Sequence, residues 1–170
     1  MDTVIPSNGV DVFNEYFSQM TQTTWNKRFL SLAEHIASWS KDPSSQIGAV
    51  IVDSNRRIVS MGYNGFPRGV HDTSERLNNR EIKYRMVLHA EENAILFAKQ
   101  NLDGCSLYVT KMPPCSHCAA LIIQSGIKHV YAPAMEIPER WRESVALTRQ
   151  MFKEGGVELN FIKMEENKNA

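Results

Sequence analysis

Four side chains that could hold and use a metal ion lie in two short stretches of the sequence. The stretch LHAEENAIL contains His89 and Glu91. The stretch MPPCSHCAAL contains Cys115 and Cys118. Imidazoles and thiolates are ligands that zinc prefers, and a catalytic zinc keeps one of its four positions open for water. These residues are therefore either ordinary packing and capping residues or the parts of a catalytic zinc site.

The two cysteines form a Cys-x-x-Cys pair at the start of a predicted helix. Pro114 fixes the turn before Cys115, and the positive end of the helix dipole favours thiolates. His89 begins another predicted helix, so two helix N-termini could bring His89, Cys115 and Cys118 to one ion. Alone, the cysteine pair is also typical of redox sites, and a histidine at a helix start is often a cap. Their combination favours zinc.

Glu91 has the position of a proton carrier. It lies two residues after His89 on the first turn of the same helix, near the expected ion but poorly placed to bind it. A carboxylate there can take a proton from a zinc-activated water molecule and pass it to a substrate nitrogen. An acidic first turn also suits the helix dipole, so Glu91 alone would not indicate catalysis. The candidate zinc ligands beside it favour that role.

The composition is that of a soluble globular domain, with 170 residues of which 42% are hydrophobic and 22% charged. Nineteen basic and nineteen acidic residues balance, which argues against binding of long nucleic acid but not of a small phosphate. No apolar run approaches the ~18 residues that span a membrane, and the N-terminus has no signal-peptide pattern. Three cysteines favour metal binding over disulfides. We predict a cytoplasmic protein without a membrane partner.

The elements predicted around the motifs indicate an α/β domain. Helices at 10–20 and 24–39 precede two strands, 46–53 and 56–62, joined by a tight turn, and then a long loop at 63–83 without periodicity. After the loop, helices and strands alternate: helix 89–100, strand 105–110, helix 116–125, strand 127–132, helix 139–154 and strand 157–162. This order predicts a mixed sheet covered by helices. Gly126 is expected to cap its helix in a left-handed conformation.

The motifs resemble those of a known superfamily. HAEENAI and PPCSHCAALIIQSGIKHVY resemble the zinc-dependent cytidine deaminases. The stretches QIGAVIVDSNRRIVSMGYNGFPRG and KYRMVLHAEENAI extend the similarity over about residues 27–131, in a pattern similar to the deoxycytidylate (dCMP) deaminase branch. The resemblance implies a three-layer α/β/α domain with a mixed five-stranded sheet. It also implies hydrolysis of dCMP to dUMP and ammonia.

The resemblance assigns roles to the four motif residues. One zinc would be held by His89, Cys115 and Cys118. The zinc-activated water would attack C4 of cytosine, and Glu91 would protonate N3 and later the leaving amine.

The resemblance also implies nucleotide contacts. Asn64 occupies the position at which relatives contact the sugar or base. Gly65, Phe66 and Arg68 follow in a loop that dCMP deaminases link to a regulatory site, where dCTP with Mg²⁺ activates and dTTP inhibits. The loop could therefore serve substrate or effector, or be a plain tight turn. Further candidates for substrate contacts, each equally open to a surface or core role, are Lys83, Arg85, Ala90, Tyr131, Arg140 and Trp141.

The expected organisation is a single deaminase domain at 25–165, preceded by an extension at 1–24 that can form a helix and followed by a frayed tail at 166–170. The resemblance implies a homo-oligomer, with a hexamer favoured. Apolar residues of the extension could pack on the domain or on a neighbouring subunit: Val12, Phe13, Tyr16 and Phe17.

Other readings stay open. The substrate could be a modified dCMP, another small cytosine-like amine or a tRNA base, and the chain could be a zinc-stabilised nucleotide sensor without catalysis. Glu91 argues against the sensor, because a structural zinc site has no use for it. Cys105 is expected in the core, and His117 exposed or near the ligands. Structural or surface roles are expected for His35, His71 and His129.

Overall fold

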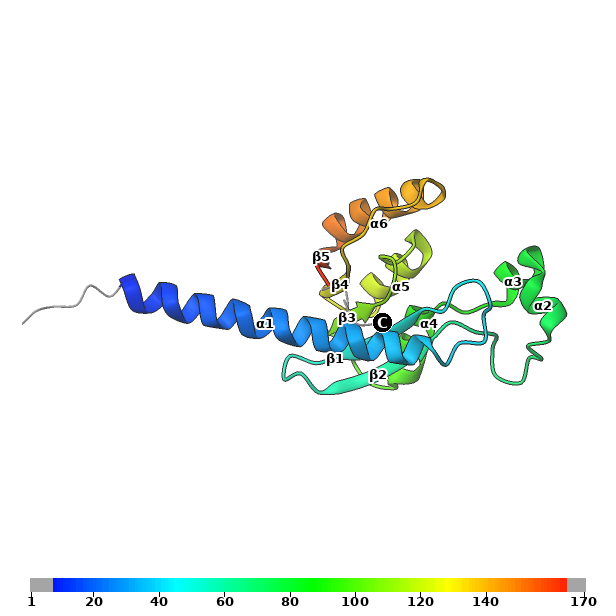
Figure 1. Ribbon diagram of the computed structural model, residues 1–170, viewed down its shortest axis with the longest axis horizontal. Coiled ribbons are helices and arrows are strands. Elements are labelled where there is room, and N and C mark those ends of the chain that lie inside the picture. Colours follow the sequence, from blue (N-terminus) through cyan, green and yellow to red (C-terminus); the bar gives the residue numbers. More distant parts are fainter. Residues whose placement is uncertain (1–7, 165–170) are drawn as a thin grey trace, which may run out of the picture.

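The computed structural model describes residues 8–164, which form three layers (Figure 1). A five-stranded sheet lies between one long helix on one face and three helices on the other. The three-layer α/β/α fold is thus confirmed. Within residues 8–164, no helix combines the length and the apolar character needed to cross a membrane.

The sheet is mixed, as expected. Its strands lie in the order β2-β1-β3-β4-β5, with β1 antiparallel to both of its neighbours and β3, β4 and β5 parallel. The strands are β1 (Gly48–Val52), β2 (Ile58–Tyr63), β3 (Ser106–Val109), β4 (His129–Pro133) and β5 (Glu158–Ile162). The parallel half matters for the site, because parallel strands require crossover helices, and the crossover between β3 and β4 begins with Cys115 and Cys118.

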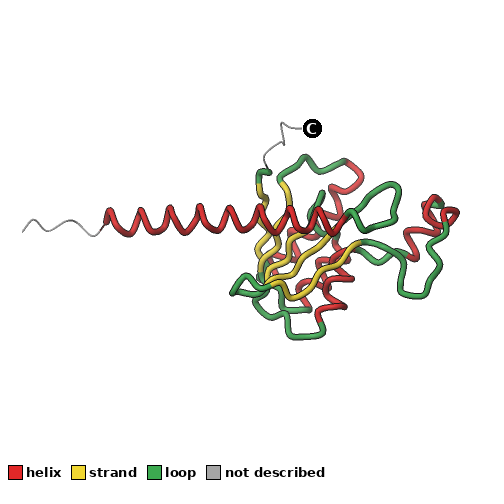
Figure 2. Tube along the Cα trace, turned by 60° about the horizontal axis from the view of Figure 1, so that its bottom comes forward, coloured by secondary structure: helices red, strands yellow, loops and turns green. Residues whose placement is uncertain are grey.

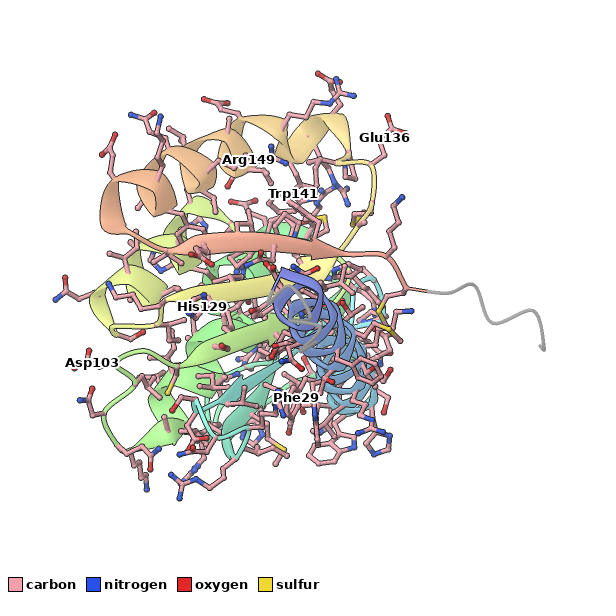
Figure 3. The ribbon with its side chains drawn as sticks, turned by 90° about the vertical axis from the view of Figure 1, so that its left-hand side faces the viewer. Phe29, Asp103, His129, Glu136, Trp141 and Arg149 are labelled. Atoms are coloured by element: carbon pink, nitrogen blue, oxygen red, sulfur yellow. The ribbon has the colours of Figure 1, made fainter. Side chains whose placement is uncertain are left out.

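One face of the sheet is covered by α1 (Asn8–Ala37), which crosses the strands in Figure 2. Phe29 packs against Tyr108 with ring centroids 5.1 Å apart, and Tyr108 stacks on Tyr131 at 4.7 Å. Figure 3, in which Phe29 is labelled, looks along α1 at this layer. The buried residues of this face are Phe29, Leu30, Ala33, Ile36, Val50, Val52 and Tyr108.

The opposite face is covered by α4 (Ala90–Ala98), α5 (Ser116–Gln124) and α6 (Arg142–Gly155). A short 3-10 helix, η1 (Glu139–Trp141), leads into α6. Their apolar sides form the larger core with the sheet, which includes Ala94 of α4, Ile122 of α5 and Phe152 of α6. Arg149 of α6 lies over the ring of Phe161 in β5 at 5.4 Å (Figure 3). The helices that begin with the motifs therefore share one layer.

Two glycines let helices lie directly on the sheet. A Cβ at Gly62 of β2 would stand 2.5 Å from the carbonyl oxygen of Ala90 in α4, and one at Gly48 of β1 would collide with the backbone of Ala33 and Ala37 in α1. A side chain at either position would push the helix outward. Gly62 consequently brings the start of α4 against the sheet.

The N-terminal helix differs from the prediction. The expected separate helices at 10–20 and 24–39 are wrong, because α1 runs without a break from Asn8 to Ala37. Within this continuous helix, Thr21 Oγ1 donates to the Phe17 carbonyl at 2.8 Å and Thr24 Oγ1 to the Met20 carbonyl at 3.0 Å, so both hydroxyls bind the preceding turn. Figure 1 shows the N-terminal half of α1 extending beyond the rest of the domain.

The expected loop at 63–83 also differs, because two short helices occupy its second half. They are α2 (Ser74–Asn78) and α3 (Arg80–Met86). Thr73 Oγ1 accepts from the Arg76 amide at 3.4 Å and Asn79 Oδ1 from the Ile82 amide at 3.2 Å, so each helix has a side-chain cap. The caps let two helices form without a long periodic sequence.

The other predicted elements are confirmed to within a few residues, and Gly126 has the expected left-handed conformation with a φ of 86°. The side chains of Val12, Phe13 and Tyr16 lie outside the described part of the chain, as does the predicted tail at 166–170. Phe17 of α1 is 55% exposed.

Candidate active site

His89, Cys115 and Cys118 converge between two helix N-termini. His89 precedes α4, while Cys115 precedes α5 and Cys118 lies in its first turn. Nδ1 of His89 is 3.2 Å from Sγ of Cys118 and 3.5 Å from Sγ of Cys115. One ligand atom from each residue lies within 4.8 Å of the others. The packing of α4 beside α5 therefore brings together three residues from two distant segments.

This arrangement fits a zinc ion. Tetrahedral bonds of about 2.0–2.3 Å to nitrogen and sulfur place neighbouring donor atoms roughly 3.5 Å apart, close to the separations around His89. One imidazole and two thiols leave the fourth position of a tetrahedral ion without a protein ligand, as in catalytic rather than structural zinc sites. The described residues His89, Cys115 and Cys118 can thus hold a catalytic zinc.

Backbone pairing holds the approach to His89. The amide of Gly65 donates to the carbonyl of Leu88 at 3.1 Å, and the amide of Leu88 donates to the carbonyl of Gly65 at 2.9 Å. This bridge joins the loop after β2 to the residue before His89. The loop, like α4, therefore determines where the histidine stands.

Glu92 holds the same histidine from the other side. Its Oε2 accepts a hydrogen bond from the His89 amide at 2.5 Å, and its Oε1 lies 3.2 Å from Nε2 of His117. His117 is exposed and lies between the two cysteines in the sequence, as expected. Glu92 consequently connects the start of α4 with the start of α5.

His89, Cys115 and Cys118 form a network of hydrogen bonds and charges. The Cys115 thiolate is stabilised by hydrogen bonds from Cys118 and His89, which hold the pKa of Cys115 far below its usual value. The same bonds raise the pKa of His89 and of Cys118. Zinc requires thiolates and a neutral imidazole, so its binding would release protons from His89 and Cys118.

Glu91 is buried beside this cluster, with 5% of its surface exposed. Burial raises the pKa of Glu91 to about 7, against the opposing effect of the His89 charge. A carboxyl group with a pKa near neutrality can both take up and give up a proton at physiological pH. The site therefore combines a metal-ligand set with an acid-base group.

The sequence matches a known family over most of this domain. Residues 23–134 match the family described as the cytidine and deoxycytidylate deaminase zinc-binding region. The chain belongs to this family. The matched range includes His89, Glu91, Cys115 and Cys118, the residues that the structure brings together.

Individual proteins with similar sequences or structures are also named deaminases. An uncharacterized deaminase in the luxG 3′ region of Aliivibrio fischeri is 51% identical over 143 residues, which cover 83% of this chain and 95% of the relative. The deoxycytidylate deaminase of Mus musculus is 42% identical over 143 residues, covering 78% and 76%. The dCMP deaminase of cyanophage S-TIM5 has a similar structure, with a TM-score of 0.60 and 28% identity over 82% of this chain and 96% of the phage protein.

The deaminase structure does not bring every candidate residue to the metal cluster. Lys83 is buried and donates to Asp42 Oδ1 at 2.9 Å and to Ser44 Oγ at 3.0 Å. Tyr131 stacks on Tyr108 in the core on the α1 face, whereas the cysteines belong to the opposite face. These contacts give Lys83 and Tyr131 structural partners away from the ligands.

Asn64 is buried, and both polar atoms of its side chain bind the backbone of the segment before β1. Its Oδ1 accepts from the Ile47 amide at 2.8 Å and its Nδ2 donates to the Ser45 carbonyl at 2.8 Å. Asn64 therefore fixes the loop that continues to Gly65.

The remaining candidates lie as follows. Ala90 is fully buried at the start of α4, next to Glu91. Phe66 is half-buried, and the exposed Arg68 has its guanidinium 5.9 Å from the ring of Phe97. Arg85 pairs with Glu81 on the surface of α3, and Arg140 lies over the ring of Trp141 at 5.7 Å (Figure 3).

The histidines and the third cysteine outside the cluster have surface or core positions. His35 and His71 are exposed, while Nδ1 of His129 lies 3.1 Å from Glu158 Oε2 across two strands. Cys105 is buried in the core, as expected.

Several residues that hold the candidate site residues or their neighbours have no role that the sequence alone predicted. Glu92 stands at the third position of α4, where a carboxylate commonly returns to the residue before the helix, so its bond to His89 could have been predicted. Asp42, Ser144 and Thr148 come from distant segments and bind Lys83, Ser116 and Pro114. No local pattern marks these three.

Proposed function

We propose that this protein hydrolyses dCMP to dUMP and ammonia with one zinc ion per chain. The observation that carries the proposal is the cluster of His89, Cys115 and Cys118 beside the buried Glu91. The similarity to the deoxycytidylate deaminase of Mus musculus supports dCMP as the substrate. A structure of the cyanophage S-TIM5 enzyme in complex with dCMP and dUMP, 27% identical to this chain, supports it too.

The chain's own groups would handle the protons of the reaction. When bound, zinc would lower the pKa of a water molecule enough to make it a nucleophile near neutral pH. Glu91 would accept a proton from that water and transfer it to N3 of cytosine, and it would then take the proton of the new C4 hydroxyl group and pass it to the amine, so that the C4–N bond breaks and a C4 carbonyl remains. The raised pKa of Glu91, about 7, suits this exchange in both directions. The products would be dUMP and ammonia.

We further propose that the loop of Gly65, Phe66 and Arg68 binds a nucleotide effector, with dCTP and Mg²⁺ as activator and dTTP as inhibitor. The loop is paired to Leu88, immediately before His89. A ligand that moved Gly65 would therefore act on the position of a zinc ligand. Arg68 is exposed and offers a guanidinium for phosphate.

We also propose that the protein acts as a cytoplasmic homo-oligomer, with a hexamer favoured. Exposed apolar side chains on α1 and α4 support self-association: Phe17, Met20, Leu96 and Phe97. These residues lie on two separate helices, as an assembly with more than one kind of contact would require.

A substrate panel tests the proposed reaction. Zinc-loaded protein would be given dCMP, CMP, deoxycytidine, 5-methyl-dCMP and a tRNA, each with and without dCTP and Mg²⁺, and ammonia would be measured. Turnover of dCMP well above the others would support the proposal, and a rise with dCTP would support the effector. Preferred turnover of 5-methyl-dCMP or tRNA would contradict the assigned substrate, and no turnover at all would contradict catalysis.

A further inference from the structure

The helix that begins at Cys115 lacks a cap of its own. Cys115 is the N-cap residue of α5, and its side chain makes no capping hydrogen bond. The first amides of a helix have no partner inside it and need an acceptor. An N-cap side chain reaches the second or third amide of its helix and not the first. The amide of Ser116, the first residue of α5, therefore needs an acceptor from elsewhere in the chain.

Ser144 of α6 supplies that acceptor. Its Oγ accepts a hydrogen bond from the amide of Ser116, the first residue of α5, at 3.0 Å. The same hydroxyl donates to Oγ of Ser116 at 3.3 Å. Ser144 is half-buried and far from the motif in the sequence. It thus gives the first amide of α5 an acceptor from a neighbouring helix.

Thr148 of α6 holds the residue on the other side of Cys115. Its Oγ1 donates to the carbonyl of Pro114 at 3.0 Å, and the side chain is fully buried. Threonine inside a helix commonly donates to the carbonyl four residues earlier in its own helix. Thr148 donates to another segment instead. Ser144 and Thr148, four residues apart on one side of α6, therefore bracket Cys115.

We propose that Ser144 and Thr148 are positioning residues for the zinc ligand Cys115. This inference rests on the proposed zinc site and extends it to a helix without a metal ligand. By fixing Pro114 and Ser116, the two hydroxyls hold the backbone of Cys115 so that its sulfur meets Cys118 and His89. Removing groups that orient a metal ligand typically costs about 10–100-fold in metal affinity or activity.

The test measures zinc retention in Thr148→Val and Ser144→Ala. Valine keeps the shape of threonine without its hydroxyl, and the Thr148→Ser variant restores a hydroxyl at the same place. Each zinc-loaded protein would be mixed with a coloured chelator, and the rate of zinc transfer followed. We expect transfer about 10-fold faster in Thr148→Val and in Ser144→Ala, with Thr148→Ser close to wild type.

A second readout follows the cysteines directly. In protein loaded with Co²⁺ in place of zinc, the thiolate-to-cobalt absorption reports how the two sulfurs bind the ion. We expect this band to shift or weaken in Thr148→Val and Ser144→Ala. The matched control is Ser125→Ala, since Ser125 Oγ donates to the Ile122 carbonyl at 2.8 Å at the far end of α5. The control should keep the wild-type transfer rate and spectrum.

The outcomes separate this inference from the proposed function. If Thr148→Val and Ser144→Ala lower only the melting temperature and keep the wild-type zinc transfer rate and cobalt spectrum, the positioning role is overturned while the zinc site stands. If both readouts change but dCMP is not a substrate, the positioning role is supported and the substrate is overturned. A wild-type protein that binds no zinc would overturn both. If Thr148→Val does not fold, the zinc transfer rate and cobalt spectrum of Ser144→Ala decide between these outcomes, because Ser144 is only half-buried.

Discussion

At the scale of single residues, the site depends on neighbours that take no part in the chemistry. Glu92 binds the amide of His89, and Ser144 and Thr148 bind the residues around Cys115. Each reactive residue stands at a helix start, where free amides require partners. Glu92 and Ser144 each accept a backbone amide at these helix starts, while Thr148 donates to the carbonyl of Pro114.

Asp42 and Lys83 form a buried ion pair outside the ligand cluster, and its pH dependence can be predicted. Burial raises the pKa of Asp42, but hydrogen bonds from the Ser44 and Ser45 amides and from Lys83 outweigh it and leave the pKa lowered. A carboxyl group with a lowered folded pKa stabilises the protein above its unfolded pKa, about 3.9, and loses this contribution as the pH falls through the folded value.

We therefore predict that Asp42→Asn lowers the free energy of unfolding most at neutral pH. The loss should be roughly 3–5 kcal/mol at pH 7, because it leaves the ammonium group of Lys83 buried without its partner. Urea unfolding of wild type and variant at pH 7, 5, 4 and 3.5 measures the difference, which should shrink below about pH 4. A difference that stayed constant across this range would contradict the assigned role of Asp42.

The sequence predicts the residues that would carry the chemistry better than it predicts the residues that hold other side chains in place. Spacing places His89 with Glu91 at one predicted helix start and Cys115 with Cys118 at another, and the family resemblance joins the two pairs. The position of Lys83, six residues before His89, suggests a phosphate contact, yet its nearest charge is Asp42 from the segment after α1. Such a pair depends on tertiary packing, and no local pattern reveals it.

At the scale of elements, the position of α4 is set by the glycine on which it rests. We predict that Gly62→Ala destabilises the protein by roughly 1–3 kcal/mol, since the added methyl group would overlap the backbone of Ala90 and Ala94 and force α4 outward. Chemical denaturation measures the loss, and faster zinc transfer to a chelator would report the displacement of His89.

The control for this prediction is Gly65→Ala, because the nearest atom to its added methyl group is 3.9 Å away on the Tyr63 ring. It should change the free energy of unfolding by less than Gly62→Ala. Equal losses in the two variants would show that the effect comes from the flexibility of glycine rather than from the contact with α4.

Element boundaries are predicted well where hydrophobic periodicity meets a turn residue, as at the hairpin between β1 and β2 and at Gly126 after α5. They fail at Thr21, which follows the first predicted helix but lies within α1, and at Asn79, whose side chain caps α3 within an apparently irregular segment. Composition alone cannot distinguish these hydroxyl and amide groups from those of a loop.

At the scale of the whole molecule, the long α1 belongs to the domain through its C-terminal half. Trp25 and Phe29 stack at 5.6 Å and lead into the aromatic contacts with β3, while the N-terminal half extends past the sheet (Figure 1). A helix that continues beyond the body it packs against offers a surface to another subunit. Phe17 and Met20 are half-exposed on that part.

We predict that the purified protein sediments as a homo-oligomer, with six times the 19.3 kDa mass of the chain favoured. Replacing Phe17 and Met20 by serine should shift the distribution towards smaller species, whereas serine at the exposed Thr23 of the same helix should not. Sedimentation velocity at several concentrations measures this. A wild-type protein that remained a monomer throughout would contradict the proposed assembly.

The most direct test of the central claim is ammonia release from dCMP by wild type and Glu91→Gln, each prepared with one zinc per chain. The amide resembles the carboxyl group in shape but cannot carry the proton. We predict dUMP formation by wild type and a rate at least about 100-fold lower in the variant, with zinc retained. Equal rates would show that Glu91 is not the proton carrier, and no reaction in either protein would contradict deamination of dCMP.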